Sequence, residues 1–159
     1  MSGDVFLKIE GVTGESQDEK HKDEIDVLGW SWGLMQTGTM HVGSGGGAGK
    51  AMVQDISITK FVDKSSPELL ASITKGEHFK NATLICRKAG GSPIEYLKIE
   101  MEEVMITNLS TGGSGEATQT ENITLNFRKF TYTYTPQKDD GTAEAAITKK
   151  YDIAMNKPE

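Results

Sequence analysis

Apolar and polar side chains alternate along most of the chain, and this period of two predicts β-strands. The alternating segments are 4–11, 24–38, 51–62, 81–107, 121–136 and 146–155. Between them lie stretches rich in polar residues or glycine, such as 13–24 and 90–93, which are typical of loops and hairpin turns. The chain is therefore predicted to be mainly β.

Residues 63–79 break the alternation and have the pattern of a short helix. Ser65 or Ser66 can cap its beginning, Glu68 complements the helix dipole, and Gly76 is a plausible stop. The apolar stripe of this helix consists of Leu69, Leu70 and Ile73. We expect the helix to pack on a sheet or across the open end of a barrel.

The alternation changes phase inside two of the long predicted strands. Apolar residues move from odd to even positions at 102–103, and the same happens at 128–129. A β-bulge would absorb such a slip, and bulges mark the corners of strongly curved sheets. The two slips favour an antiparallel β-barrel of two curved sheets, with one short α-helix and a long Gly-rich loop.

The segment 24–38 has two faces of different composition. The large residues share one parity and are predicted to face the core; they are Leu28, Trp30, Trp32 and Leu34. Gly29, Ser31 and Gly33 share the other parity. This second face is smooth, so a neighbouring backbone, a partner subunit or water in a channel can approach it closely.

Composition narrows the range of functions that the chain could have. The 159 residues, 36% of them hydrophobic, suffice for one domain with a sizeable core, over residues 1–159. There are 17 Lys and Arg against 23 Asp and Glu, a net charge of −6, and neither sign forms a long block, so nucleic-acid binding is not indicated. Cys86 has no partner for a disulfide or zinc site, and its apolar neighbours predict a buried residue.

The N-terminal stretch "MSGDVFLKIEG" has neither a basic leader nor a long apolar run, and no other segment approaches the length of a transmembrane helix. We therefore expect synthesis in a cytosol, no membrane insertion and no cleaved signal peptide. Export by another route stays open.

The stretch "HVGSGGGAGK", residues 41–50, ends like a phosphate-binding loop. That motif needs a glycine where Ser44 stands and a hydroxyl where Ala51 stands. It also needs a following helix, whereas residues 51–62 have a strand pattern. A flexible surface loop between two strands is the interpretation we favour.

The other residue patterns that could support metal binding or catalysis are incomplete. His21, His41 and His78 lack metal-ligand spacing, and His21 and His41 lie in polar segments where solvated side chains are expected. Ser114 resembles a hydrolase nucleophile, but Glu116 replaces the second glycine of that motif. The sequence thus predicts no enzyme, no metal and no cofactor.

Five blocks of sequence carry a resemblance to a known family. They are "EIDVLGWSWGLMQTGTMHVGSGGGAGK", "VQDISITKFVDKSSPELL", "KGEHFKNATLICRKAGG", "EYLKIEMEEVMITNLSTGGSG" and "ENITLNF". In this order they are similar to the haemolysin-coregulated protein (Hcp) family, from Asp4 to about Phe127; the tract after Tyr134 is the least similar.

The resemblance implies the tube subunit of the bacterial type VI secretion system, a barrel that forms hexameric rings stacked into a hollow tube. Such a subunit would act in the bacterial cytoplasm and then be secreted to the exterior or into a target cell. It would carry effectors in its lumen, with spike, sheath and baseplate proteins as further partners. No catalysis is implied.

The resemblance also implies roles for particular residues. Candidates for the lumen wall are Gly29, Ser31, Gly33 and Ser114. The loop that would reach the neighbouring ring consists of Thr39, Met40, His41, Val42, Gly43, Ser44, Gly45, Gly46, Gly47, Ala48, Gly49 and Lys50. Glycines fit there because the backbone must adopt positive φ and lie flat against another chain.

Two alternatives remain open. The aromatic pairs Trp30 with Trp32 and Tyr132 with Tyr134 could stack sugars, although burial in a core is the commoner role of such rings. The first alternative is therefore a carbohydrate- or small-ligand-binding β-barrel. The second alternative, which ranks third after the tube subunit and the ligand-binding barrel, is a nucleotide-binding protein.

Overall fold

A computed structural model describes residues 3–38, 40–41, 50–90 and 93–159. The elements in this part of the chain are β1 (Asp4–Ile9), β2 (Ile25–Ser31), β3 (Leu34–Met35), β4 (Met52–Val53), β5 (Ile56–Phe61), α1 (Ser65–Lys75), β6 (His78–Arg87), β7 (Glu95–Gly112), β8 (Thr120–Tyr134), β9 (Ile147–Asp152) and β10 (Lys157–Pro158). The prediction of a mainly β chain with a short helix is confirmed.

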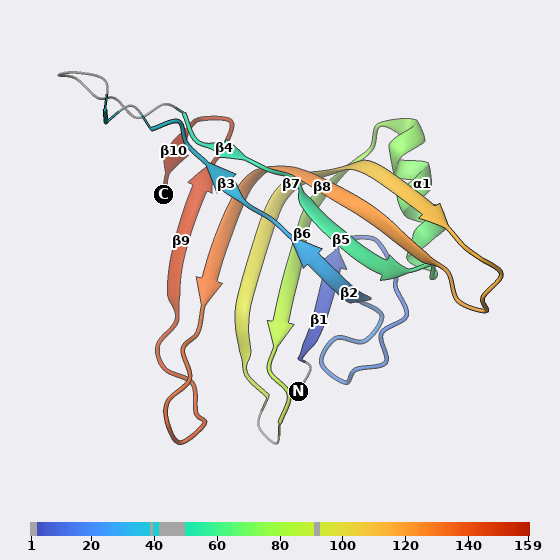
Figure 1. Ribbon diagram of the computed structural model, residues 1–159, viewed down its shortest axis with the longest axis horizontal. Coiled ribbons are helices and arrows are strands. Elements are labelled where there is room, and N and C mark those ends of the chain that lie inside the picture. Colours follow the sequence, from blue (N-terminus) through green and yellow to red (C-terminus); the bar gives the residue numbers. More distant parts are fainter. Residues whose placement is uncertain (1–2, 39, 42–49, 91–92) are drawn as a thin grey trace.

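Six of these strands close into an antiparallel barrel in the order β8-β5-β2-β1-β6-β7, because β7 pairs back onto β8. β9 and β10 extend the sheet beyond β8, and β3 and β4 form a separate two-stranded ribbon (Figure 1). The predicted antiparallel barrel is confirmed. Inward-facing side chains fill it, including Leu7, Ile58 and Met101, which are at most 1% exposed.

The two phase slips are real, but no bulge absorbs them. On either side of the slip Met101 pairs with Phe130 and Val104 with Phe127, so the register of β7 and β8 is unchanged. β6 changes phase at the same place: its buried residues there are Phe79 and Ala82, one at an odd and one at an even position. We call the row formed by residues 80–81, 102–103 and 128–129 the crease. Three neighbouring strands change phase together there, with Glu103 at a φ of 54°.

Bulges occur elsewhere, between Val27 and Gly29, Cys86 and Arg87, and Ile106 and Asn108. The bulge in β2 explains why the prediction for Leu28 is wrong: Ile25 and Val27 face inward, whereas Leu28 is 51% exposed. Leu34 is also exposed.

After this bulge, Trp30 and Trp32 pack against the core as predicted. Cys86 is buried, as predicted, and burial raises the pKa of its thiol.

Helix α1 ends as predicted but begins differently. Gly76 adopts the left-handed conformation at its C-terminus, with its N–H bonded to the carbonyl of Ile73. At the N-terminus Asp63, rather than a serine, accepts hydrogen bonds from the N–H and hydroxyl of Ser65. Of the predicted stripe, Leu69 is in the core, whereas Leu70 and Ile73 are exposed.

A buried ion cluster fastens this helix to the barrel. Lys60, which is 0% exposed, projects from β5 and contacts the carboxylate of Glu121 on β8. Its ammonium lies 3.0 Å from Asp63 Oδ1, and the Ser66 hydroxyl donates to Glu121 Oε1 at 2.6 Å. Two acids and a hydroxyl, from β8, α1 and the loop before α1, therefore compensate one buried charge.

We expect Glu121→Gln to lower the free energy of unfolding by about 3 kcal/mol, because it removes the more deeply buried of the two carboxylates that contact Lys60 and leaves Asp63 as the remaining one. Denaturant titration at fixed protomer concentration measures this, with the exposed Glu116→Gln as control. The double variant Lys60→Met/Glu121→Leu should recover stability relative to Glu121→Gln, since an apolar pair removes both buried charges. Equal stability of Glu121→Gln and Glu116→Gln would contradict the assignment.

Candidate functional site

The outer surface of the barrel carries a smooth, uncharged area across four strands. One row of paired residues crosses β2, β5, β8 and β7 as Gly29, Thr59, Asn122 and Ser110. The next row is Ser31, Ser57, Thr124 and Asn108. We call these eight residues the small polar face.

The face is the reverse side of the core. Between its two rows lie Ile58 on β5 and Ile123 on β8, paired with each other and at most 1% exposed. Because successive side chains on a strand point to opposite sides, the inward isoleucines force their neighbours outward. Threonine and asparagine there keep the strand pairing while presenting short polar groups.

The polar groups on and beside this face bind one another. Thr59 Oγ1 donates to Asn122 Oδ1 at 2.7 Å. At its edge, Asp55 accepts hydrogen bonds from Thr107 Oγ1 at 2.7 Å and from Asn126 Nδ2 at 2.9 Å. Such an arrangement offers a hydrated, rigid wall, and its side chains include no acid–base or nucleophile pair of the kind catalysis uses.

The structure brings two of the four predicted lumen residues together. Gly29 and Ser31 lie in adjacent rows of the small polar face. Gly33 lies off it: its carbonyl accepts a hydrogen bond from the N–H of Gln54, whose side chain is 3.2 Å from where a Cβ would stand. Ser114 is exposed in the hairpin loop beyond the last pair of β7 and β8, Gly112 with Thr120.

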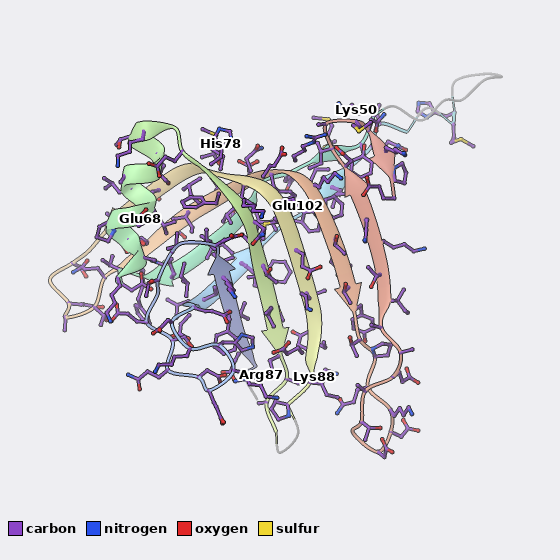
Figure 2. The ribbon with its side chains drawn as sticks, turned by 180° about the vertical axis from the view of Figure 1, so that it is seen from behind. Lys50, Glu68, His78, Arg87, Lys88 and Glu102 are labelled. Atoms are coloured by element: carbon purple, nitrogen blue, oxygen red, sulfur yellow. The ribbon has the colours of Figure 1, made fainter. Side chains whose placement is uncertain are left out.

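Of the predicted stacking loop, Met40, His41 and Lys50 are exposed. Thr39 and residues 42–49 lie outside the described residues. The β3–β4 ribbon forms the base of this loop and carries exposed apolar side chains, namely Leu34, Met35 and Met52. Figure 2 shows Lys50 and His78 at the opposite end of the molecule from Arg87 and Lys88.

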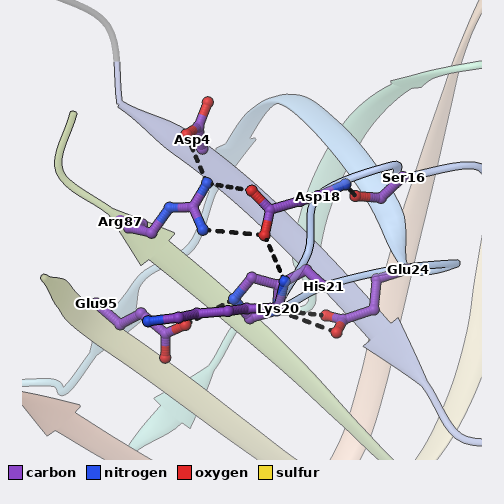
Figure 3. A network of polar contacts seen from close by, with 8 residues as sticks. All are labelled: Asp4, Ser16, Asp18, Lys20, His21, Glu24, Arg87 and Glu95. Atoms are coloured by element: carbon purple, nitrogen blue, oxygen red, sulfur yellow. Dashed lines mark hydrogen bonds and ion pairs between the residues drawn. The ribbon is translucent and has the colours of Figure 1, made fainter. Parts of the chain in front are cut away.

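Sequence reasoning missed a polar network around His21, drawn in Figure 3. The prediction of a solvated His21 is wrong: it is 5% exposed and stacks on Phe6 at 4.4 Å between ring centroids. Its Nδ1 lies 3.0 Å from Glu24, and its Nε2 lies 2.6 Å from Glu95. Glu95 is 74 positions away in sequence, so no local pattern could reveal this contact.

The second half of the network is centred on Arg87. Its guanidinium lies 2.5 Å from Asp18 and 2.9 Å from Asp4, and its charge rests over the Phe6 ring at 5.0 Å. The hydrogen bond to Arg87 lowers the pKa of Asp18 to about 2, and the same contact raises the pKa of Arg87. The network therefore ties the loop after β1 to β6 and β7.

Neither the network nor any other part of the described chain groups three or more His, Cys, Asp or Glu residues so that they could hold a metal ion. His21 has a carboxylate against each ring nitrogen, Glu24 from its own loop and Glu95 from β7, which indicates a structural clasp. Within the described residues, no helix is long and apolar enough to cross a membrane.

The Asp18–Arg87 pair makes stability depend on acid pH. A carboxyl with a depressed folded-state pKa contributes stability above its ordinary pKa of 3.8, and this contribution is lost as pH falls towards about 2. We therefore expect Asp18→Asn to be less stable than the wild type at neutral pH and to show a smaller further loss between pH 4 and 2. Denaturant midpoints across this window measure it, with exposed Asp139→Asn as control. Parallel curves for wild type and Asp18→Asn would contradict the assignment.

Comparison with known proteins gives a consistent result. A family model described as "Type VI secretion system effector, Hcp" matches residues 6–134. The chain is 52% identical to Protein hcp1 of Pseudomonas aeruginosa over 151 residues, which cover 94% of this chain and 93% of that protein.

Two solved structures are similar throughout. One, described as the structure of a type six secretion system protein, has a TM-score of 0.94 at 29% identity and covers 99% of this chain and 100% of that one. Hcp1 from Salmonella typhimurium has a TM-score of 0.83 at 37% identity, with 100% of both chains covered.

Proposed function

The chain belongs to the Hcp family of the type VI secretion system, and on this basis we propose that it is the structural subunit of a secretion tube. Members of this family are tube proteins rather than enzymes. In the proposed role, six copies close into a ring, rings stack into a hollow tube, and the tube is secreted with effectors in its lumen.

The observation that carries this proposal is the small polar face. Gly29 and Ser31 lie beside Ser57 and Thr59 in a face whose eight residues include no charged and no large apolar side chain. As a lumen wall, such a surface leaves a wide bore and binds cargo weakly over many small contacts, which suits a cargo that must be released. Gly33 and Ser114 lie off this face, so the proposal rests on Gly29 and Ser31.

Ring stacking is proposed for the loop Thr39–Lys50. The ribbon that bears it projects from one end of the barrel (Figure 1). Apolar side chains in the loop and at its base are exposed, with Met40 at 87% and Met52 at 58%. Exposed apolar groups gathered on a projecting ribbon are typical of a contact with another protein surface. The contact we propose is with a subunit of the next ring.

Further partners are effectors and the spike, sheath and baseplate proteins of the machine. We propose that the protein is made in the bacterial cytoplasm and leaves through the machine, to the exterior or into a target cell, without a cleaved signal peptide.

The alternative, a barrel that holds a sugar or small ligand, is less well supported. The barrel interior is filled by side chains such as Leu7, Ile99 and Met101, each 0% exposed. Trp32 stacks on Tyr132 and meets Phe130 edge-on, so these rings contact one another.

Native mass spectrometry of the purified chain should show a hexamer as the main species. Strong dilution should convert it to monomers, since association follows mass action. A protein that stays monomeric at high concentration and under crowding would contradict the proposal.

Ser31→Gln should reduce effector retention while rings still form, because the longer side chain narrows the wall where cargo rests. Co-purification of effector with hexamers measures this. Thr142→Gln, a matched change in an exposed loop away from the face, should retain effector normally. Intact Ser31→Gln rings with unchanged retention would rule out Ser31 as a lumen residue.

A further inference from the structure

The β3–β4 ribbon carries two methionines directly opposite each other. Met35 on β3 pairs with Met52 on β4, and their side chains are 56% and 58% exposed. Direct cross-strand partners have Cβ atoms about 5 Å apart, so both thioethers lie on one face of the ribbon. Methionine commonly fills gaps in a core, as Met101 does here at 0% exposure. We call Met35 and Met52 the methionine pair, and packing within this chain does not account for it.

The position of the ribbon turns the methionine pair away from the barrel (Figure 1). The other residue pair of the ribbon is Leu34 with Val53, and Val53 packs against the core. Successive side chains on a strand point to opposite sides, so the pair lies on the side turned away from that core.

Two hydrogen bonds hold the base of the ribbon. The indole N–H of Trp32 donates to the carbonyl of Gln54 at 2.8 Å, and the N–H of Gln54 donates to the carbonyl of Gly33 at 3.0 Å. The methionine pair is therefore presented on a held support. A chemical change at the two sulfurs would alter the surface of the ribbon and leave the barrel core as it is.

The accessible sulfur of this chain lies in thioethers rather than in a thiol. The single cysteine, Cys86, is 2% exposed, and burial raises the pKa of its thiol. Thiols react with oxidants as thiolates and only where the oxidant can reach them. An oxidant that meets the folded protein therefore reacts at exposed methionines before it reacts at Cys86.

We propose that the methionine pair is a site of oxidative modification, and that its oxidation prevents the ribbon from packing against another protein surface. The inference rests on the proposed stacking of rings through the ribbon and its loop, and it adds a regulation to that contact. The oxidant is a peroxide. A lone pair of each sulfur attacks one peroxide oxygen, the O–O bond breaks, and the thioether becomes a sulfoxide. With hydrogen peroxide, the leaving hydroxide takes the proton of the transferred hydroxyl and departs as water.

A sulfoxide makes the ribbon a poor apolar contact. Its oxygen accepts hydrogen bonds, and burying such a group without a donor costs free energy. A second sulfoxide on the opposite strand offers no donor either. In a ring the same cost recurs in every copy, so a modest loss for one subunit becomes a large one for the contact between two rings.

Oxidation and stacking should therefore exclude each other. In the single chain both thioethers are exposed, whereas in the proposed tube the next ring would cover them. An oxidant met before stacking would keep rings apart. Rings that have already stacked would shield their methionine pairs from the same oxidant.

The first test measures where oxygen is added. Purified hexamers are treated with increasing hydrogen peroxide, and peptide mass spectrometry follows the gain of one oxygen at each methionine. Met35 and Met52 should be oxidised at a peroxide dose about tenfold or more below that needed for buried Met101, the control within the same chain. Equal doses for the pair and Met101, or an unmodified pair, would overturn the inference.

The second test measures ring association by sedimentation velocity in concentrated protein, with and without prior peroxide treatment. Treatment should weaken the association of wild-type rings by about tenfold or more. For Met35→Leu/Met52→Leu, treated and untreated samples should associate equally, because leucine keeps the apolar volume and has no sulfur. Met40→Leu, in the loop, and Met155→Leu, 63% exposed elsewhere, are matched controls that should stay sensitive to peroxide.

Met35→Gln/Met52→Gln imitates the polar sulfoxides without an oxidant and should associate as weakly as the treated wild type. A double leucine variant as sensitive as the wild type, or a treated wild type that associates normally, would overturn the inference while the proposed stacking stands. Wild-type rings that never associate, treated or untreated, would instead contradict the proposed stacking, and the regulation with it.

Discussion

The strict alternation of side chains around a closed barrel is the constraint on which the rest of this structure depends. Closure satisfies the backbone hydrogen bonds of six strands, and the inward positions then supply the whole core. Because Ile56, Ile58, Ile123 and Leu125 are at most 1% exposed, the residues between them need contribute nothing to burial. Those outward positions can therefore be glycine, serine, threonine and asparagine, and a smooth uncharged wall follows without loss of core burial.

Apart from Asp55 at its edge, that wall carries no charge, and the buried charged groups lie where separate elements are held together. The Lys60 cluster fastens α1 to the barrel, the Arg87 and His21 network holds the loop after β1, and Arg128 with Lys129 flanks buried Asp152 at the crease. Each joint connects elements that are distant in sequence. A buried ion pair adds little net stability, because the cost of removing both charges from water offsets much of their attraction. The charged groups thus define how the elements are held, while the polar face remains free of them.

The sequence predicted what depends on local pattern and failed where distant residues decide. The strand periodicity, the Gly76 stop and the burial of Cys86 are local properties, and the structure confirms them. Leu28 follows the right parity, but a single bulge in β2 reverses its orientation. The crease preserves register because three strands slip together, which a strand considered alone cannot show. His21 is buried only because Glu95 approaches it from another strand. At the candidate site, the alternation of side chains predicted that Gly29 and Ser31 share a face. That Ser57, Thr59 and Thr124 lie beside them depends on the order of the strands in the sheet, which the pattern of one strand does not give.

If the small polar face lines the proposed lumen, its lack of charge has a physical consequence for cargo. A lumen lined by one sign of charge would concentrate proteins of the opposite sign and exclude the rest, because fields are focused inside a narrow channel. The chain has a net charge of −6, yet the eight residues of the small polar face include no charge. Short hydroxyl and amide groups, some already bonded to one another, attract any polar surface weakly and none strongly. In the proposed tube, selectivity for a particular effector would then come from its fit within the bore and from the number of small contacts it makes at once. Weak adhesion per contact would also let the cargo leave when the ring opens or the tube ends.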